Sequence, residues 1–116
     1  MAADPDCIFC KIVAGEIPGE VVQRSDDAVA FRDLNPAAPT HVLVVPVDHA
    51  ENAAATAAAD PALVGRLVSV AAQVADAEGL GGDYRLVLNT GAGSGQSVFH
   101  THLHLLGGRP MTWPPG

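Results

Sequence analysis

The sequence predicts an α+β fold, in which a main helix covers one face of an antiparallel sheet of short strands. Three observations predict it: short apolar segments occupy residues 21–47, one helical pattern follows at 60–79, and further strands fit 84–106. Strands that precede and follow a helix in blocks are typical of α+β proteins. A chain of 116 residues can bury one small core, so we expect a single domain over 1–116.

The first strands form a predicted hairpin. Val21–Arg24 and Ala28–Phe31 are apolar segments, and the turn-favouring residues 25–27 join them. The next strand, His41–Val47, is rich in valine, which predicts a central position with both faces buried. Pro46 indicates that this strand ends there, because proline cannot donate a hydrogen bond to a neighbouring strand.

The main helix is predicted to follow Asp60. Asp60 is a favoured N-cap, Pro61 suits the first helical position, and Gly79 is typical of a helix end. Apolar residues recur between them at helical spacing: Leu63, Leu67, Val70 and Val74. The alanine-rich segment 51–59 predicts a short helix, and 84–89 predicts another strand. Because a small sheet is unstable alone, we expect the main helix to cover one of its faces.

The chain is acidic, with a formal net charge of −7 and only six lysines and arginines. Nucleic acids and anionic membranes select basic surfaces, so neither is an expected partner. The sequence has no apolar segment of membrane-spanning length and no leader pattern, which predicts a cytoplasmic location. A phosphate group would have to be bound by backbone N–H groups and histidines.

Three of the five histidines alternate with other residues at positions 100, 102 and 104. In an extended strand, alternate side chains lie on one face, about 6.5–7 Å apart, so the three rings are expected to share a face. The glycine-rich segment 90–97 precedes them directly. A loop rich in N–H donors followed by a strand of imidazoles predicts a site for phosphate chemistry.

The segment 96–106, Gln-Ser-Val-Phe-His-Thr-His-Leu-His-Leu-Leu, resembles the signature of the histidine triad (HIT) family, His-φ-His-φ-His-φ-φ, in which φ is apolar. Thr101 departs from the signature, on the face opposite the histidines. Further similar segments lie at 7–18, 38–46, 107–109 and 113–116. The last of these, Trp-Pro-Pro-Gly, is most similar to the Hint branch, the purine nucleoside phosphoramidate hydrolases. The resemblance implies a five-stranded antiparallel sheet with one main helix and one short helix, a homodimer, and an extended tail at 110–116.

The resemblance also implies hydrolysis of a phosphorus–nitrogen bond in purine nucleoside 5′-phosphoramidates. In the family the middle histidine attacks the α-phosphorus, which makes His102 the expected nucleophile. His104 would contact the phosphate or the leaving group, where a protonated ring would offset negative charge. The backbone carbonyl of His100 would orient the His102 ring. His41 matches a histidine that supports the triad, and Ser97 matches a serine that contacts the phosphoryl group.

Further residues match the family's nucleotide site. Asp33 matches the acidic residue that accepts hydrogen bonds from both ribose hydroxyls. Asn89 matches a residue near the phosphate and ribose, and Gly95 and Val98 lie in the loop before the triad. Trp113 cannot bury itself within the short tail, so we expect it near the active site of the partner subunit. An apolar clamp around the purine is implied at Ile8, Phe9, Phe31, Leu34 and Leu43.

The residues alone leave plainer interpretations open. His102 fits a metal-binding histidine or a hydrogen-bonded one on a strand, and His41 fits a residue that begins a strand. Asp33 fits an Asx turn. The segment 90–97 fits an ordinary glycine-rich turn, and the apolar clamp residues fit the hydrophobic core.

Cys7 and Cys10 form a Cys-x-x-Cys motif whose spacing suits two zinc ligands. Zinc usually takes four ligands, and the other candidates are His49 and His100. Some bacterial members of the family hold structural zinc with such a Cys₂His₂ set, so zinc is the favoured interpretation. A reduced thiol pair comes second. A redox pair comes third, because that motif is expected at a helix start after a strand.

Two other functions remain open at this stage. One is a hydrolase of the same family that acts on dinucleoside polyphosphates, although the Trp-Pro-Pro-Gly ending disfavours it. The other is a nucleotide-binding protein without catalysis, which the complete triad and Ser97 disfavour.

Overall fold

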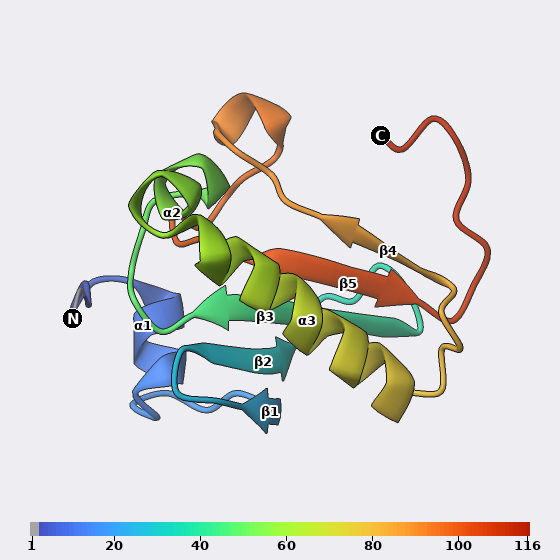
Figure 1. Ribbon diagram of the computed structural model, residues 1–116, viewed down its shortest axis with the longest axis horizontal. Coiled ribbons are helices and arrows are strands. Elements are labelled where there is room, and N and C mark those ends of the chain that lie inside the picture. The colour runs from blue at the N-terminus through green and yellow to red at the C-terminus, as the bar shows by residue number, and fades with distance from the viewer. Residues whose placement is uncertain (1–2) are drawn as a thin grey trace.

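The computed structural model describes residues 3–116 and contains an antiparallel sheet of five strands together with three α-helices (Figure 1). The elements are α1 (Ile8–Val13), β1 (Val21–Arg24), β2 (Ala28–Arg32), β3 (Thr40–Pro46), α2 (Ala53–Ala59), α3 (Pro61–Ala77), β4 (Tyr84–Val87), the short 3₁₀ helix η1 (Ala92–Ser94) and β5 (Leu103–Gly107). The predicted α+β class with a five-stranded antiparallel sheet is confirmed. No helix within residues 3–116 is long and apolar enough to cross a membrane.

The sheet has the strand order β1-β2-β3-β5-β4, which places β3 at its centre. All seven residues of β3 are buried, as its valine-rich sequence predicts for a central strand. Successive side chains of a strand point to opposite faces, so β3 contributes to two cores. Val42 and Val44 pack toward α3, whereas Leu43 and Val45 pack toward α1.

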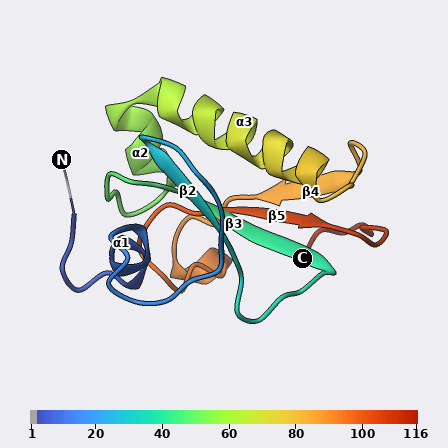
Figure 2. The same cartoon turned by 90° about the horizontal axis from the view of Figure 1, so that it is seen from below.

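The two faces of the sheet are covered differently (Figure 2). Helix α3 lies across one face, and α2 adjoins its beginning. Helix α1 lies on the opposite face, together with the glycine-rich segment that contains η1. Histidines 100, 102 and 104 belong to that second side, where Phe9 of α1 stacks edge-on against His100 and His102. The long helix therefore covers one face of the sheet, and the candidate site lies on the other face (Figure 2).

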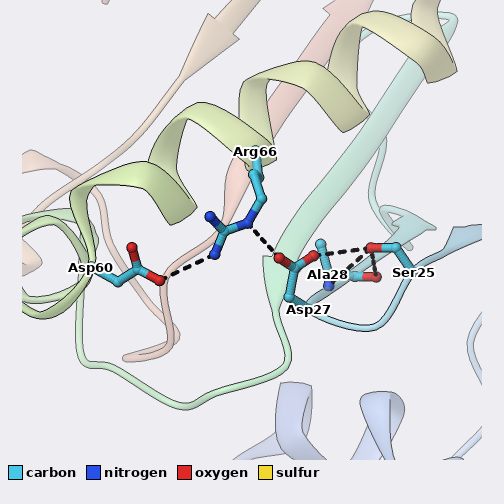
Figure 3. Close-up of polar contacts among 5 residues, drawn as sticks. All are labelled: Ser25, Asp27, Ala28, Asp60 and Arg66. Atoms are coloured by element: carbon cyan, nitrogen blue, oxygen red, sulfur yellow. Dashed lines mark hydrogen bonds and ion pairs between the residues drawn. The ribbon is translucent and has the colours of Figure 1, made fainter.

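Helix α3 is tied to the β1–β2 hairpin by an arginine (Figure 3). Asp60 precedes the helix as predicted, but its carboxylate accepts a hydrogen bond from Arg66, 3.1 Å away, rather than capping the helix. The guanidinium of Arg66 also donates to Asp27 in the hairpin turn. The turn itself is closed by Ser25, whose hydroxyl accepts a bond from the Ala28 N–H at 3.2 Å.

The sequence analysis missed one helix and misplaced one end of each of the last two strands. It predicted one main and one short helix and missed α1, which has only six residues and shows too little periodicity to be recognised. Strand β4 ends at Val87 rather than Asn89. Strand β5 begins at Leu103, so His100 and His102 precede the strand on which they were expected. The Thr101 N–H donates to the Ala50 carbonyl, 3.0 Å away, instead of to a neighbouring strand.

Thr101, the residue that departs from the apolar pattern, is buried and only 1% exposed. Its hydroxyl oxygen lies 2.7 Å from that of Thr56 in α2, and either hydroxyl can donate. A buried hydroxyl without a partner would be costly, so the two threonines satisfy each other. This contact joins α2 to the backbone that carries the histidines.

Leu67 offers a test of the core on the α3 side, because its side chain is only 1% exposed. We expect Leu67→Ala to lower the free energy of unfolding by roughly 2–5 kcal/mol through lost burial and a residual cavity. Ser69→Ala on the exposed side of the same helix serves as the control. Urea unfolding measures the stability of the two variants. Equal stability would contradict the placement of Leu67 in the core.

Candidate functional site

A cleft of about 280 Å³ opens on the side of the sheet that faces α1. It lies between α1, the ends of β2 and β3, and the residues that precede β5. Predicted site residues line it as follows: Ile8, Phe9, Phe31, Asp33, Leu34, Leu43, Ser97, Val98, His102 and His104. Sequence reasoning missed five further lining residues: Ile12, Pro18, Gly19, Arg32 and Asn35. The cleft is thus apolar on one wall and carries imidazoles on the other.

Three predicted substrate contacts lie outside the cleft lining in the described chain: Asn89, Gly95 and Trp113. Gly95 has φ = +98°, a conformation that glycine adopts without strain, and the Asn89 amide lies beside it. Trp113 is 81% exposed, and the Arg85 guanidinium lies 5.9 Å from its ring centre. The Trp113 side chain is therefore available to a second surface, and its docking in a partner subunit stays a prediction.

The His102 ring is fixed by a hydrogen bond to its own chain. Its Nδ1 lies 2.7 Å from the backbone carbonyl oxygen of His100, and a carbonyl can only accept. The proton of the neutral ring is therefore on Nδ1, which leaves a lone pair on Nε2. Because His102 lines the cleft, the cleft contains an imidazole of fixed orientation whose Nε2 lone pair is not engaged by that bond.

A chain of hydrogen bonds fixes the tautomers of His41 and His104 as well. The Ala37 N–H donates to Nδ1 of His41 at 3.0 Å, so His41 carries its proton on Nε2. That Nε2 lies 2.9 Å from Nδ1 of His104, which must accept, and so His104 carries its own proton on Nε2. Among residues 3–116 this buried Nε2 has no hydrogen-bond partner. His104 therefore lines the cleft with one ring donor that no atom of the described chain uses.

The His104 donor is neutral. Burial lowers the pKa of His104 to about 4, and the neighbouring His102 and His41 rings add to the shift. Burial likewise lowers the pKa of His41, although Asp33 opposes this. The sequence analysis expected a protonated ring at His104 to offset negative charge on the substrate, and that role stays a prediction. Without substrate, burial makes an extra charge there unfavourable.

Asp33 has two roles in the structure. Its Oδ1 accepts a bond from the Asn35 N–H at 2.8 Å, which is the Asx turn left open above. Its Oδ2 lies 3.4 Å from Nε2 of His41. Asp33, His41 and His104 gather closely enough to suggest a metal site. However, Ala37 occupies the His41 lone pair and leaves a proton on Nε2, so this group is a hydrogen-bonded relay.

A second cluster contains the two cysteines and two histidines. Sγ of Cys7 lies 3.4 Å from Nδ1 of His100, and Sγ of Cys10 lies 3.5 Å from Nδ1 of both His49 and His100. The two imidazole Nδ1 atoms are 3.1 Å apart. Tetrahedral zinc, with bond lengths of about 2.0–2.3 Å, separates its ligand atoms by roughly 3.3–3.8 Å. The four side chains therefore fit a zinc ion with small adjustments.

The surroundings of His100 support its role as a metal ligand. Its Nε2 lies 2.8 Å from the Pro46 carbonyl, which fixes the proton on Nε2 and turns the Nδ1 lone pair toward the cysteines. Burial also lowers the pKa of His100 to about 4, which favours the unprotonated ring. Cys7 caps α1, so the motif does begin a helix, but no strand precedes it within the described residues, as the argument made above against a redox pair requires. The close approach of the two Nδ1 atoms also favours a metal.

Gln96 is a structural residue of the site that sequence reasoning missed. It is 3% exposed, and its amide oxygen accepts a bond from the Gly91 N–H at 2.8 Å. Its amide nitrogen donates to the carbonyls of Glu51 and Val98, at 2.7 and 3.1 Å. These bonds close the glycine-rich loop and fix the position of Ser97 at the cleft. A single glutamine next to the histidines carried no periodic signal.

Comparisons with known proteins agree with this geometry. The sequence profile of the HIT domain matches residues 14–111. A crystal structure of a HIT family hydrolase from Legionella pneumophila superposes with a TM-score of 0.91 at 49% identity, covering 96% of this chain and 100% of that chain. A 14 kDa zinc-binding protein of Zea mays is 47% identical over 97% of this chain and 90% of its own length. The purine nucleoside phosphoramidase of Escherichia coli is 44% identical over 91% of this chain and 90% of its own length. The chain belongs to the HIT family.

Proposed function

We propose that this protein is a hydrolase that cleaves the phosphorus–nitrogen bond of purine nucleoside 5′-phosphoramidates. The observation that carries the proposal is the fixed tautomer of His102, whose Nδ1 lies 2.7 Å from the His100 carbonyl while its ring lines the cleft. The similarity to a purine nucleoside phosphoramidase over 91% of the chain supports the choice of substrate.

The reaction has two steps. In the first, the Nε2 lone pair of His102 attacks the α-phosphorus, and the phosphorus–nitrogen bond breaks. The leaving nitrogen takes a proton from solvent and departs as the amine, and the nucleotide stays on Nε2 of His102. In the second, a water molecule attacks the same phosphorus and returns a proton to solvent, the bond to Nε2 breaks, and the nucleoside monophosphate leaves. The imidazole is regenerated, so no group is consumed besides water.

His104 supports both steps in this proposal. Its free Nε2–H can donate to a phosphoryl oxygen or to the leaving nitrogen, where negative charge develops. The relay through His41 keeps the Nδ1 of His104 occupied as an acceptor and so keeps the donor in place. Ser97 also lines the cleft and can contribute a hydroxyl.

The nucleoside would occupy the rest of the cleft. Phe9 and Phe31 pack edge-on with ring centres 5.4 Å apart, and they form an apolar wall with the other clamp residues. Such a wall suits a flat purine ring. The Asp33 carboxylate lies at the cleft and has acceptor capacity left for ribose hydroxyls.

Zinc and a second subunit complete the proposal. We assign a structural zinc ion to Cys7, Cys10, His49 and His100, which the ligand distances and the zinc-binding relative support. The ion would link the cysteines of α1 and its cap to His100, and so hold the helix against the residues that precede β5. We also propose a homodimer in which the exposed Trp113 contacts the partner's cleft.

His102→Ala should abolish turnover of an adenosine phosphoramidate, with a loss on the order of 10³-fold or more, because the variant lacks the nucleophile. Its affinity for adenosine monophosphate should remain largely unchanged, since the apolar wall and Asp33 are intact. Single-turnover kinetics and calorimetry test the two parts. Near-wild-type turnover would overturn the covalent mechanism. Faster cleavage of a diadenosine polyphosphate by the wild type would favour the alternative hydrolase class.

The pH dependence of stability tests the neutral state of His104. Burial lowers its pKa to about 4, whereas in the unfolded chain it is about 6.5. Between these values the unfolded state binds the proton and the folded state does not, so stability falls as pH decreases. His104→Gln cannot titrate, and its stability should decline less from pH 7.5 to pH 5. Urea unfolding of the two metal-loaded proteins gives the free energy of unfolding at each pH. If this free energy fell equally with decreasing pH in both, the shifted pKa of His104 would be contradicted.

The protein purified without a tag should contain about one zinc ion per chain, because the four ligand atoms match a tetrahedral site. Elemental analysis measures the content. Removing the ion with a chelator should lower the unfolding temperature. A metal-free preparation whose stability does not respond to added zinc would contradict the assignment.

A further inference from the structure

His100 belongs to two sites at once. Its ring lies in the Cys₂His₂ cluster, with Nδ1 3.4 Å from Cys7 and 3.5 Å from Cys10. Its backbone carbonyl, in the same residue, accepts the hydrogen bond that fixes the tautomer of His102. A displacement of the ring therefore moves the acceptor on which the nucleophile depends.

We propose that His100 is a positioning residue that couples metal occupancy of the Cys₂His₂ cluster to the reactivity of His102. The metal site is then a control point of the reaction, in addition to a structural support. This inference rests on the proposed function in one respect, the use of His102 as nucleophile. The coupling itself concerns the orientation of one imidazole and can be measured without substrate.

The ligand geometry gives the first reason for coupling. With both cysteines and both histidines facing a common point, the Nδ1 atoms of His49 and His100 approach each other at 3.1 Å. The bond to Pro46 leaves the Nδ1 of His100 as an acceptor, so this approach is favourable when a metal ion lies between the rings or when His49 carries its proton on Nδ1 and donates it. Without the metal, the His100 ring therefore exchanges its bond to the ion for a hydrogen bond from His49, and a different contact sets its position. The His100 side chain has no exposed surface, so its movement has to involve the backbone around it.

A second contact links the same cluster to His102. Phe9 lies between the two cysteines on α1, and its ring packs edge-on against His102 with centres 5.0 Å apart. The cap bond from the Cys10 N–H to Cys7 Sγ, 3.4 Å long, holds this turn of the helix. A shift of the thiolates would therefore move the aromatic face that packs against the nucleophile. The ring of His102 is thus held on two sides by residues of the metal cluster or beside it.

The cluster is also reachable from solvent. A hollow of about 310 Å³ is lined by Cys7 and His49, and by the carboxylates Asp4 and Asp6. The carboxylates attract cations, and two of the four ligands lie at the hollow's surface. A metal ion or a chelator can therefore enter without passing through the nucleotide cleft. Metal exchange in the folded protein would then change the reactive site directly.

The direct test measures the tautomer of His102 by nitrogen-15 NMR of the full-length protein labelled at histidine. The zinc-loaded protein should show His102 with its proton on Nδ1 only. After removal of zinc by a chelator, we expect a mixture of tautomers, and re-addition of zinc should restore the single form. An unchanged His102 signal in a folded, metal-free protein would overturn the coupling.

Kinetics give the second readout. Zinc removal should slow single-turnover formation of nucleotidyl-histidine by about 10–100-fold, the range typical of lost outer-shell support. The Kd for adenosine monophosphate should change less than this rate does, because Phe31, Leu34 and Leu43 of the apolar wall do not lie on α1. Equal losses in binding and rate would mean general loosening and would overturn the specific role of His100.

Variants separate coupling from instability. His49→Ala should behave like metal-free protein, whereas His49→Cys keeps four zinc ligands and should restore both the tautomer and the rate. Thr56→Val removes the buried hydroxyl contact with Thr101 and serves as the control, because it destabilises the same backbone without touching the cluster. If Thr56→Val shifts the His102 tautomer as strongly as His49→Ala, the coupling is overturned. If zinc-loaded wild type fails to cleave phosphoramidates, the proposed function fails, and the tautomer measurement still decides the coupling.

Discussion

The hydrogen bond from His102 Nδ1 to the His100 carbonyl depends on where β5 begins. If the strand included residues 100–102, that carbonyl could be used for pairing with a neighbouring strand. Strand β5 begins instead at Leu103, and the Thr101 N–H bonds to Ala50, which anchors the preceding residues against the segment before α2. The carbonyl is then free to accept from the imidazole two residues later. The error in the predicted strand boundary therefore lies at the most informative point of the site.

Within residues 3–116, ion pairing and burial leave the cleft of this acidic protein without a free positive charge for binding a phosphate group. Arg32 lines the cleft, but its guanidinium donates to Glu20 and Glu78 at 2.7 and 2.5 Å. The His104 donor is neutral because burial lowers its pKa to about 4. Neutral donors bind anions more weakly than charged ones do. In the proposed reaction this favours release of the nucleoside monophosphate, while the fixed tautomers keep the donor directed at the reacting group.

Periodicity and propensity predict the parts of the fold that extend over several turns or pairs. The valines of β3 predict its central position, and the repeat of Leu67 with its neighbours predicts α3. The cysteine and histidine inventory likewise predicts the metal cluster, since four suitable ligands were available. The bond that fixes the His102 tautomer was implied by the family resemblance, but the tautomers of His41 and His104 were not predictable, because the proton position on His41 depends on the backbone N–H of Ala37. Gln96 was missed for the same reason, as its partners are backbone atoms from three segments.

The short helix α1 explains why the metal cluster and the cleft belong together. Six residues are too few to form a stable helix alone, so α1 depends on contacts that its side chains make elsewhere. Cys7 and Cys10 face the cluster, whereas Ile8 and Phe9 line the cleft. This short helix and its cap thus carry two cysteines of the Cys₂His₂ cluster and part of the apolar wall of the cleft. The contacts that hold Cys7 and Cys10 therefore also position Ile8 and Phe9 at the cleft. Because α1 is short, few other contacts could hold these two residues if the cysteine contacts were lost.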